Sequence, residues 1–105
     1  MKQLTVFVQE IDARTVSEDL RAHGHRFTRM ASVGGFLEEP NVTFVLAVED
    51  GQLDDVLASF ERSSEARDVE LPLSLRDRLE DWRAATVRHA GATILISELE
   101  RIHHT

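Results

Sequence analysis

The sequence predicts an α+β fold of the ferredoxin-like type, with an antiparallel sheet and two helices on one of its faces. Three observations support this prediction. Strand-like apolar runs and helical spacings follow one another in the order βαββαβ. One of these runs is apolar on both faces, as expected for a central strand. The length of 105 residues fits one domain, so we expect a single domain over residues 1–105, with a long excursion at about residues 63–90.

The first part of the chain supplies a strand and a helix. Leu4–Val8 is a short apolar run with alternation and is predicted to be the first strand. Asp12 is a candidate cap for the helix that follows. Three apolar residues then share one helical face: Ala13, Val16 and Leu20. The helix is expected to end near Gly24, because glycine readily adopts the left-handed conformation that closes helices.

The middle of the chain supplies two further strands and the second helix. Phe27–Val33 is predicted to be a strand that the pair Gly34-Gly35 interrupts, and residues 38–41 have the composition of a turn. Val42–Val48 is the run with two apolar faces. Gln52–Arg62 has its apolar residues at helical spacing and is the clearest helix of the sequence.

The excursion separates this helix from the last strand. Ser63–Arg88 is rich in charge, yet its leucines and Trp82 make it too apolar for a disordered linker. Leu75–Trp82 could form a short helix, and Trp82 could act as a packing anchor or a lid. Gly91–Ile96 is predicted to be the buried last strand, and Leu99–His104 a short tail.

Two helices on one face of a sheet leave the other face uncovered. Such a face is often buried against further copies of the same chain, and the two-faced apolar character of Val42–Val48 favours this arrangement. The excursion could instead cover the sheet by itself.

Composition and charge restrict the function classes. The net charge of −7 disfavours a nucleic-acid polymer as partner, since such binders need a basic face. The absence of cysteine excludes disulfides and thiol nucleophiles. No apolar run approaches the ~20 residues of a membrane span, and Met1–Val8 lacks the pattern of a signal peptide, so a cytoplasmic location is expected.

Catalytic and metal-binding patterns are missing from the sequence. The adjacent acidic pairs Glu38-Glu39 and Asp54-Asp55 splay apart on a strand or helix and do not suit acid–base work. The histidine pairs His23/His25 and His103-His104 do not have the i,i+4 spacing of helical metal ligands. We therefore expect no enzyme, no metal and no cofactor.

One segment points to a ligand. Arg26–Leu37, followed by Asn41–Phe44, resembles the cyclic-di-AMP receptor proteins of the PII-like superfamily, which are related to the nitrogen-regulatory PII proteins. Val8–Glu10 and Gly91–Thr93 extend the resemblance over nearly the whole chain. It implies a PII-like homotrimer whose ligands lie in clefts between neighbouring subunits.

The resemblance also implies site residues. The positions that would contact the ligand are retained as Arg26, Thr28, Gly35, Phe36, Leu37 and Asn41. Gly34 joins them, because two glycines let backbone N–H groups approach a ligand closely. Arg26 would pair with a phosphate or stack on a base, and Phe36 would form a flat wall for a purine. Without the resemblance, Arg26 is interpreted as a solvated strand residue, and the glycine pair as either a simple bulge or a turn that also binds a ligand.

Several positions differ from the family pattern. Gly24 stands where Asn is usual and His25 where an apolar residue is usual. Three further candidate contacts also differ. Ala47 replaces a glycine of the family pattern and Leu95 replaces an aromatic residue. His104 stands near a position where glutamine is usual. These changes remove an amide donor, add bulk and remove a stacking surface, so they bear on ligand specificity.

Two functions are compatible with these features. The first is a sensor that binds a small anionic ligand, cyclic-di-AMP or another nucleotide, between subunits and relays it to an unknown protein target. The alternative is a protein-interaction module that has lost nucleotide binding. An RNA-binding ferredoxin-like domain is disfavoured, because the strand aromatics are missing and the charge has the wrong sign.

Overall fold

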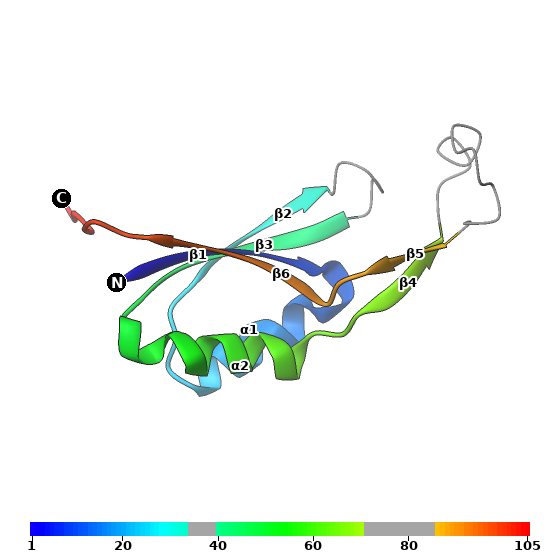
Figure 1. Ribbon diagram of the computed structural model, residues 1–105, viewed down its shortest axis with the longest axis horizontal. Coiled ribbons are helices and arrows are strands. Elements are labelled where there is room, and N and C mark those ends of the chain that lie inside the picture. Colours follow the sequence, from blue (N-terminus) through cyan, green and yellow to red (C-terminus); the bar gives the residue numbers. More distant parts are fainter. Residues whose placement is uncertain (34–39, 71–85) are drawn as a thin grey trace.

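The computed structural model describes residues 1–33, 40–70 and 86–105. Within these ranges, four strands form one antiparallel sheet in the order β2-β3-β1-β6, and two helices cover one of its faces (Figure 1). The strands are β1 (Lys2–Gln9), β2 (Thr28–Val33), β3 (Pro40–Val48) and β6 (Ala92–Glu98). The helices are α1 (Ala13–Ala22) and α2 (Leu53–Ser63). The predicted ferredoxin-like arrangement is confirmed.

The core lies between the sheet and the helix layer. Every second side chain of β1 and β3 points towards the helices, because side chains alternate along a strand. The fully or nearly buried apolar residues are Leu4, Val6, Val8, Ala13, Val16, Leu20, Val42, Phe44, Leu46, Val48, Val56 and Phe60. The central position predicted for the strand at 42–48 is confirmed, since β3 pairs with both β1 and β2.

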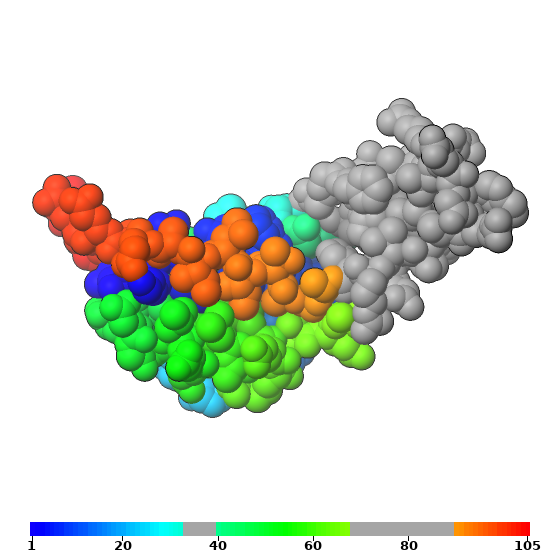
Figure 2. Space-filling view, in the orientation of Figure 1, coloured from blue at the N-terminus to red at the C-terminus, as the bar shows by residue number. Residues whose placement is uncertain are grey.

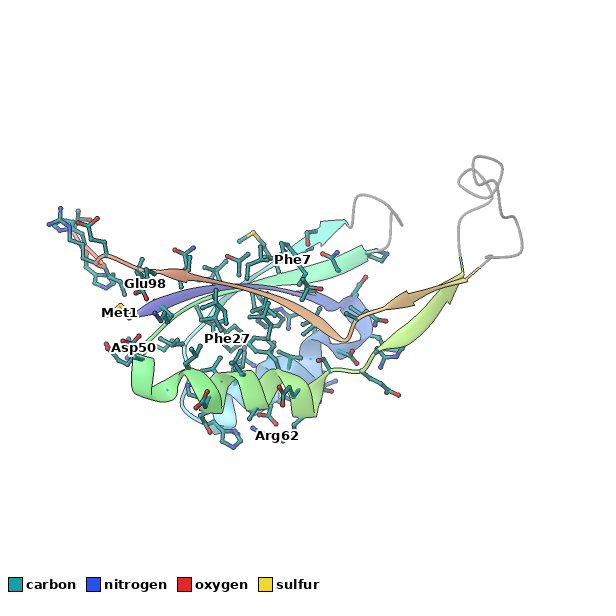
Figure 3. The ribbon with its side chains drawn as sticks, in the orientation of Figure 1. Met1, Phe7, Phe27, Asp50, Arg62 and Glu98 are labelled. Atoms are coloured by element: carbon teal, nitrogen blue, oxygen red, sulfur yellow. The ribbon has the colours of Figure 1, made fainter. Side chains whose placement is uncertain are left out.

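Phe44 is the centre of this core. Its ring lies 5.4 Å from the ring of Phe27 and 5.9 Å from that of Phe60, the latter in an edge-to-face arrangement. Phe27 lies just before β2 and points between the sheet and the helices (Figure 3). The strand predicted from Phe27 therefore begins one residue later, because Phe27 is used as a core residue at the entry of β2.

The predictions for the two ends of α1 differ in their outcome. Asp12 does precede the helix, but its side chain makes no capping hydrogen bond. Its carboxylate instead accepts hydrogen bonds from the guanidinium group of Arg67, so the capping prediction is wrong. Gly24 does have the expected left-handed conformation, with φ 76°.

The region of the excursion contains two strands that the sequence analysis did not predict. β4 (Arg67–Glu70) pairs antiparallel with β5 (Thr86–His89) as a separate two-stranded ribbon. The ribbon extends from the end of the molecule opposite to both termini (Figure 1). The short helix considered for Leu75–Trp82, and the two roles considered for Trp82, lie outside the described residues.

The sheet face opposite the helices carries apolar side chains. Phe7, Met30 and Leu95 lie on this face and are 37%, 50% and 56% exposed. Phe7 points away from the helix layer (Figure 3). We call this surface the open face. None of the described helices is long and apolar enough to cross a membrane.

Candidate ligand-binding site

The turn from α1 into β2 places two predicted contact residues on the surface. His25 and Phe27 point towards the helix layer, and the intervening Arg26 and the following Thr28 are exposed. This alternation follows from the extended backbone, in which neighbouring side chains point to opposite sides. The buried His25 and the partly buried Phe27 therefore hold Arg26 and Thr28 outwards.

Arg26 and Thr28 border a hollow of about 350 Å³. The residues that line it are Arg26, Phe27, Thr28, Val45, Ala47, Ile102 and His104. We call it the Arg26 hollow. A second hollow, of about 240 Å³, adjoins it and shares Arg26, Ala47 and Ile102 with it. Four of the predicted contact positions thus lie together: Arg26, Thr28, Ala47 and His104.

The chemistry of the Arg26 hollow suits an anion that carries a flat apolar group. A guanidinium group can donate two parallel hydrogen bonds to a phosphate, and the hydroxyl of Thr28 can donate one more. Val45 and Ile102 supply apolar walls, and the imidazole of His104 adds a ring at the rim. The size is at the lower end of the range for small-molecule sites.

The C-terminal tail contributes to this hollow from a distant part of the sequence. It follows β6, which pairs with β1, and the amide of Leu99 donates to the carbonyl oxygen of Met1 (3.1 Å). The tail extends beyond the body of the molecule in the space-filling view (Figure 2). Met1, Asp50 and Glu98 lie at this same end (Figure 3).

Asn41 lies at the other end of β3. Its neighbour across β3 and β2 is Ser32, whose hydroxyl donates to the amide oxygen of Asn41 and lies 2.9 Å from the hydroxyl of Thr43. Asn41 is buried, and this contact joins the end of β2 to the start of β3.

A separate hollow of about 540 Å³ borders Asn41. We call it the Asn41 hollow. Arg14 and Arg29, which carry guanidinium groups, also line it. Val45, the partner of Thr28, is four positions after Asn41 on β3, which corresponds to about 13 Å. The predicted site is thus divided into two groups within one chain.

Leu95 is a predicted contact on β6, the strand at the opposite edge of the sheet from β2. Thr28, Val45, Thr5 and Leu95 form one row across the open face. Because the row spans four strands, Thr28 and Leu95 are about 14 Å apart. The structure therefore does not bring Leu95 to the Arg26 hollow of its own chain.

Four predicted contacts lie outside the described residues: Gly34, Gly35, Phe36 and Leu37. The sequence analysis also missed residues that line the hollows. Val45 could have been found as a strand residue of the face that carries Ala47, two positions later. Ile102 carries a similar signal, because it is an apolar residue two positions before His104 in a polar tail.

The ribbon is attached to the sheet next to the Asn41 hollow. The Asp12 carboxylate accepts one hydrogen bond of 2.8 Å on each oxygen from Arg67, and a further one of 3.1 Å from the amide of Glu65. The Arg67 guanidinium lowers the pKa of Asp12 below its usual value, because it stabilises the charged carboxylate. This partly buried pair connects the start of α1 to β4.

Gln9 completes this attachment. Its amide nitrogen donates to the carbonyl oxygens of Glu65 (3.0 Å) and Ala90 (3.3 Å), which lie on the two legs of the ribbon. Gly91 packs directly against the backbone of Glu65. We call this cluster the ribbon base; it consists of Gln9, Asp12, Glu65, Arg67, Ala90 and Gly91.

Acidic and histidine side chains of the described residues do not gather into groups of three suited to a metal ion. The described part of the site therefore presents a cation, hydroxyls and apolar walls as its chemical groups.

These features agree with a comparison of the chain with protein families. All of it, residues 1–105, matches the family model described as cyclic-di-AMP receptor. The chain therefore belongs to the cyclic-di-AMP receptor family, and the predicted PII-like placement is consistent with this result. Membership suggests a nucleotide-sensing role in signalling.

A solved structure supports the fold. A functionally unknown protein from Pediococcus pentosaceus is similar to this chain with a TM-score of 0.73 and 24% sequence identity. The similarity covers 99% of this chain and 96% of that one. At this identity the likeness concerns the α+β architecture alone.

Proposed function

We propose that this chain is a PII-like sensor that binds a small anionic ligand, cyclic-di-AMP or another nucleotide, and relays its presence to a protein partner. The observation that carries the proposal is the convergence of predicted contact residues on the Arg26 hollow, in a chain of a receptor family. The proposal includes no catalytic step, since a receptor needs only to bind and to release.

The proposed ligand lies between neighbouring copies of the chain. Along β3, Asn41 lies about 13 Å from Val45 of the Arg26 hollow, and across the sheet Leu95 lies about 14 Å from Thr28. A cleft between two copies would unite residues that one chain keeps apart. The apolar open face offers the area on which copies, three in a PII-like trimer, would pack.

Two residues of the Arg26 hollow bear on which ligand is accepted. The methyl group of Ala47 is exposed in the hollow and narrows it. His104 offers a ring nitrogen that can donate or accept a hydrogen bond, depending on its tautomer. A nucleotide panel is therefore a sharper test than a single candidate.

The ribbon base supports a relay. Gln9 is the cross-strand partner of Asn41, and its side chain holds both legs of the ribbon. A ligand that displaces Asn41 would thus disturb the strand partner of Gln9, which belongs to the ribbon base. In this proposal the ribbon, with the segment between its strands, presents the signal to the partner.

Calorimetric titration with cyclic-di-AMP, cyclic-di-GMP, ATP, ADP and AMP tests the proposal. We expect at least one of these to bind, and we expect Arg26→Ala to weaken its binding about tenfold or more. The reason is that a charge-assisted hydrogen bond contributes roughly 1.5–3 kcal/mol, and 1.4 kcal/mol corresponds to a factor of ten.

Arg101→Ala is the matched control. It removes the same charge from the same end of the molecule, but Arg101 does not line either hollow there. Equal losses in both variants would refute the assignment of the site. No heat from any of the five nucleotides, with the protein assembled, would refute the sensor and leave the interaction module.

A further inference from the structure

One buried side chain next to Arg26 has a charged partner on the opposite helix. The side chain of His25 is 5% exposed, and its Nε2 lies 2.6 Å from Oδ2 of Asp55 in the first turn of α2. A carboxylate only accepts hydrogen bonds, so the ring donates from Nε2. Asp55 itself is 52% exposed, and His25 also lines the smaller hollow that adjoins the Arg26 hollow.

The backbone around His25 is fixed on the side of α1. Gly24 closes the helix in a left-handed conformation, and its amide donates to the carbonyl oxygen of Arg21 (3.0 Å). The amide of His25 donates to the carbonyl oxygen of Leu20 (2.9 Å). These contacts determine where the chain leaves α1, but they do not determine the direction in which it enters β2.

The His25 ring supplies this second constraint. It ties the turn to α2, a helix that is 30 residues distant in sequence. On the other side of Arg26, Phe27 is held against Phe44. Arg26 is therefore flanked by two anchored residues that both point inwards, and its own side chain is directed outwards to the hollow.

We propose that His25 and Asp55 form a positioning pair for Arg26. This inference rests on the proposed function, since it assigns the pair to the site where the anionic ligand binds. By fixing the backbone of the turn, the pair reduces the freedom that Arg26 would lose on binding a phosphate. Such preorganisation strengthens binding without adding a contact to the ligand.

The chain offers a close control for the partner residue. Asp54 precedes Asp55 in the same first turn of α2 and is exposed. Asp54→Ala therefore removes the same charge from the same helix N-terminus, where acidic residues interact favourably with the helix dipole. Asp55→Asn is the conservative variant, because its amide oxygen still accepts a hydrogen bond from the ring.

The first experiment needs no ligand. Hydrogen exchange of the His25 amide is measured in the wild type, Asp55→Ala, Asp55→Asn and Asp54→Ala. We expect about tenfold faster exchange in Asp55→Ala alone, since local opening becomes easier when one hydrogen bond to a charged group is lost. Unchanged exchange in Asp55→Ala, or an equal increase in Asp54→Ala, would overturn the proposal.

The second experiment measures affinity for the nucleotide that binds the wild type. We expect a three- to tenfold weaker Kd in Asp55→Ala and recovery to within about twofold in Asp55→Asn. A His25→Leu variant should lose a similar factor, and the double variant His25→Leu/Asp55→Ala should lose no more than either alone. Additive losses would mean that the two residues act separately and would contradict the pair.

The two experiments distinguish a failure of this inference from a failure of the proposed function on which it rests. If no nucleotide binds the wild type, the sensor fails, and the exchange result alone still decides whether the pair fixes the turn. If a nucleotide binds but Asp55→Ala leaves its Kd unchanged, the sensor stands and the positioning role is refuted.

Discussion

Asp19 of α1 joins the two helices through a single carboxylate. It accepts hydrogen bonds from Nε (2.9 Å) and Nη2 (2.6 Å) of Arg62 and from the hydroxyl of Ser59, both on α2. The Arg62 guanidinium lowers the pKa of Asp19 to about 2 from the usual value of 3.8. Because the folded state favours the charged carboxylate, this contact contributes to stability whenever Asp19 is ionised.

The sign of the pH dependence follows from this shift. The contribution of Asp19 to stability is present above pH 4. It disappears as the pH falls towards 2, where the Asp19 carboxylate becomes protonated in the folded protein as well as in the unfolded chain. We expect Asp19→Asn to lower the free energy of unfolding at pH 7 by roughly 1 kcal/mol, a value discounted because Arg62 is half exposed. Urea denaturation at pH 7, 4 and 2.5 measures it.

The difference between the wild type and Asp19→Asn should shrink between pH 4 and pH 2.5. Glu18→Gln is the control, because Glu18 forms an exposed pair with Arg14 on the same helix and should have little effect. A constant difference across this pH range would show that the ionised carboxylate is not the source of the stabilisation.

At the scale of single residues, the structure places Arg26 and Thr28, which the family resemblance implied as contacts, on one hollow. Their contact with a ligand stays a prediction. The partners of Asp12 and Asp19 could not be predicted. The arginine partner of each aspartate lies more than 40 residues away in the sequence. Asp12 also stands where aspartate commonly caps a helix, and this local preference competes with the distant pairing.

Among the elements, the ribbon base is held by close backbone packing at Gly91. A Cβ atom at this position would lie 2.9 Å from the backbone N and C atoms of Glu65. Backbone atoms cannot move aside as the end of a flexible side chain does. The two legs of the ribbon can approach each other this closely only because residue 91 is glycine.

Gly91→Ala should therefore destabilise the fold. We expect a loss of about 1–3 kcal/mol in the free energy of unfolding, the usual cost of forcing an extra methyl group into a packed position. Gly51→Ala is the control, since a Cβ there meets no atom within 4 Å. Urea denaturation of both variants provides the measurement, and equal stability of the two would contradict the tight packing at Gly91.

The two helices, β1 and β3 were predictable because each has a clear local signal. The last strand was predicted to be buried, and this is wrong: β6 is an edge strand on which Leu95 and Ile96 are exposed. α2 begins and ends within one residue of the prediction, since its apolar spacing is regular. β4 and β5 were not predictable, because Arg67–Glu70 and Thr86–His89 are short and polar and lack an alternating apolar face. Their pairing depends on contacts at the ribbon base, which are long-range.

The open face dominates the molecule as a whole. Phe7, Met30 and Leu95 expose apolar area there, on the side of the sheet that the helices leave uncovered. The sequence predicted an uncovered face from the order of the elements. It could not predict the register that sets Leu95 in one row with Thr28, because the register between strands depends on long-range contacts.

If the open face is an interface between copies, a charge on it should separate them. Light scattering of the wild type at tens of micromolar should give about three times the 11.9 kDa of one chain. We expect Phe7→Glu to reduce this mass, because a carboxylate buried in an apolar interface loses its hydration. Ile11→Glu is the control, since Ile11 is 73% exposed and lies outside the sheet.

A wild type with the mass of one chain would contradict self-association through the open face. A mass that falls equally in Phe7→Glu and Ile11→Glu would show that added charge, and not the surface, separates the copies.

The closed ribbon base has a practical consequence for protein engineering. Gln9 and Gly91 hold the two legs of the ribbon together at Glu65, before β4, and at Ala90 and Gly91, after β5. Adding residues between two points of a chain that are already held together has only a small entropic cost. A fluorescent protein inserted within residues 71–85 would thus leave the sheet intact, and any ligand-driven change at the base would become a change in its emission.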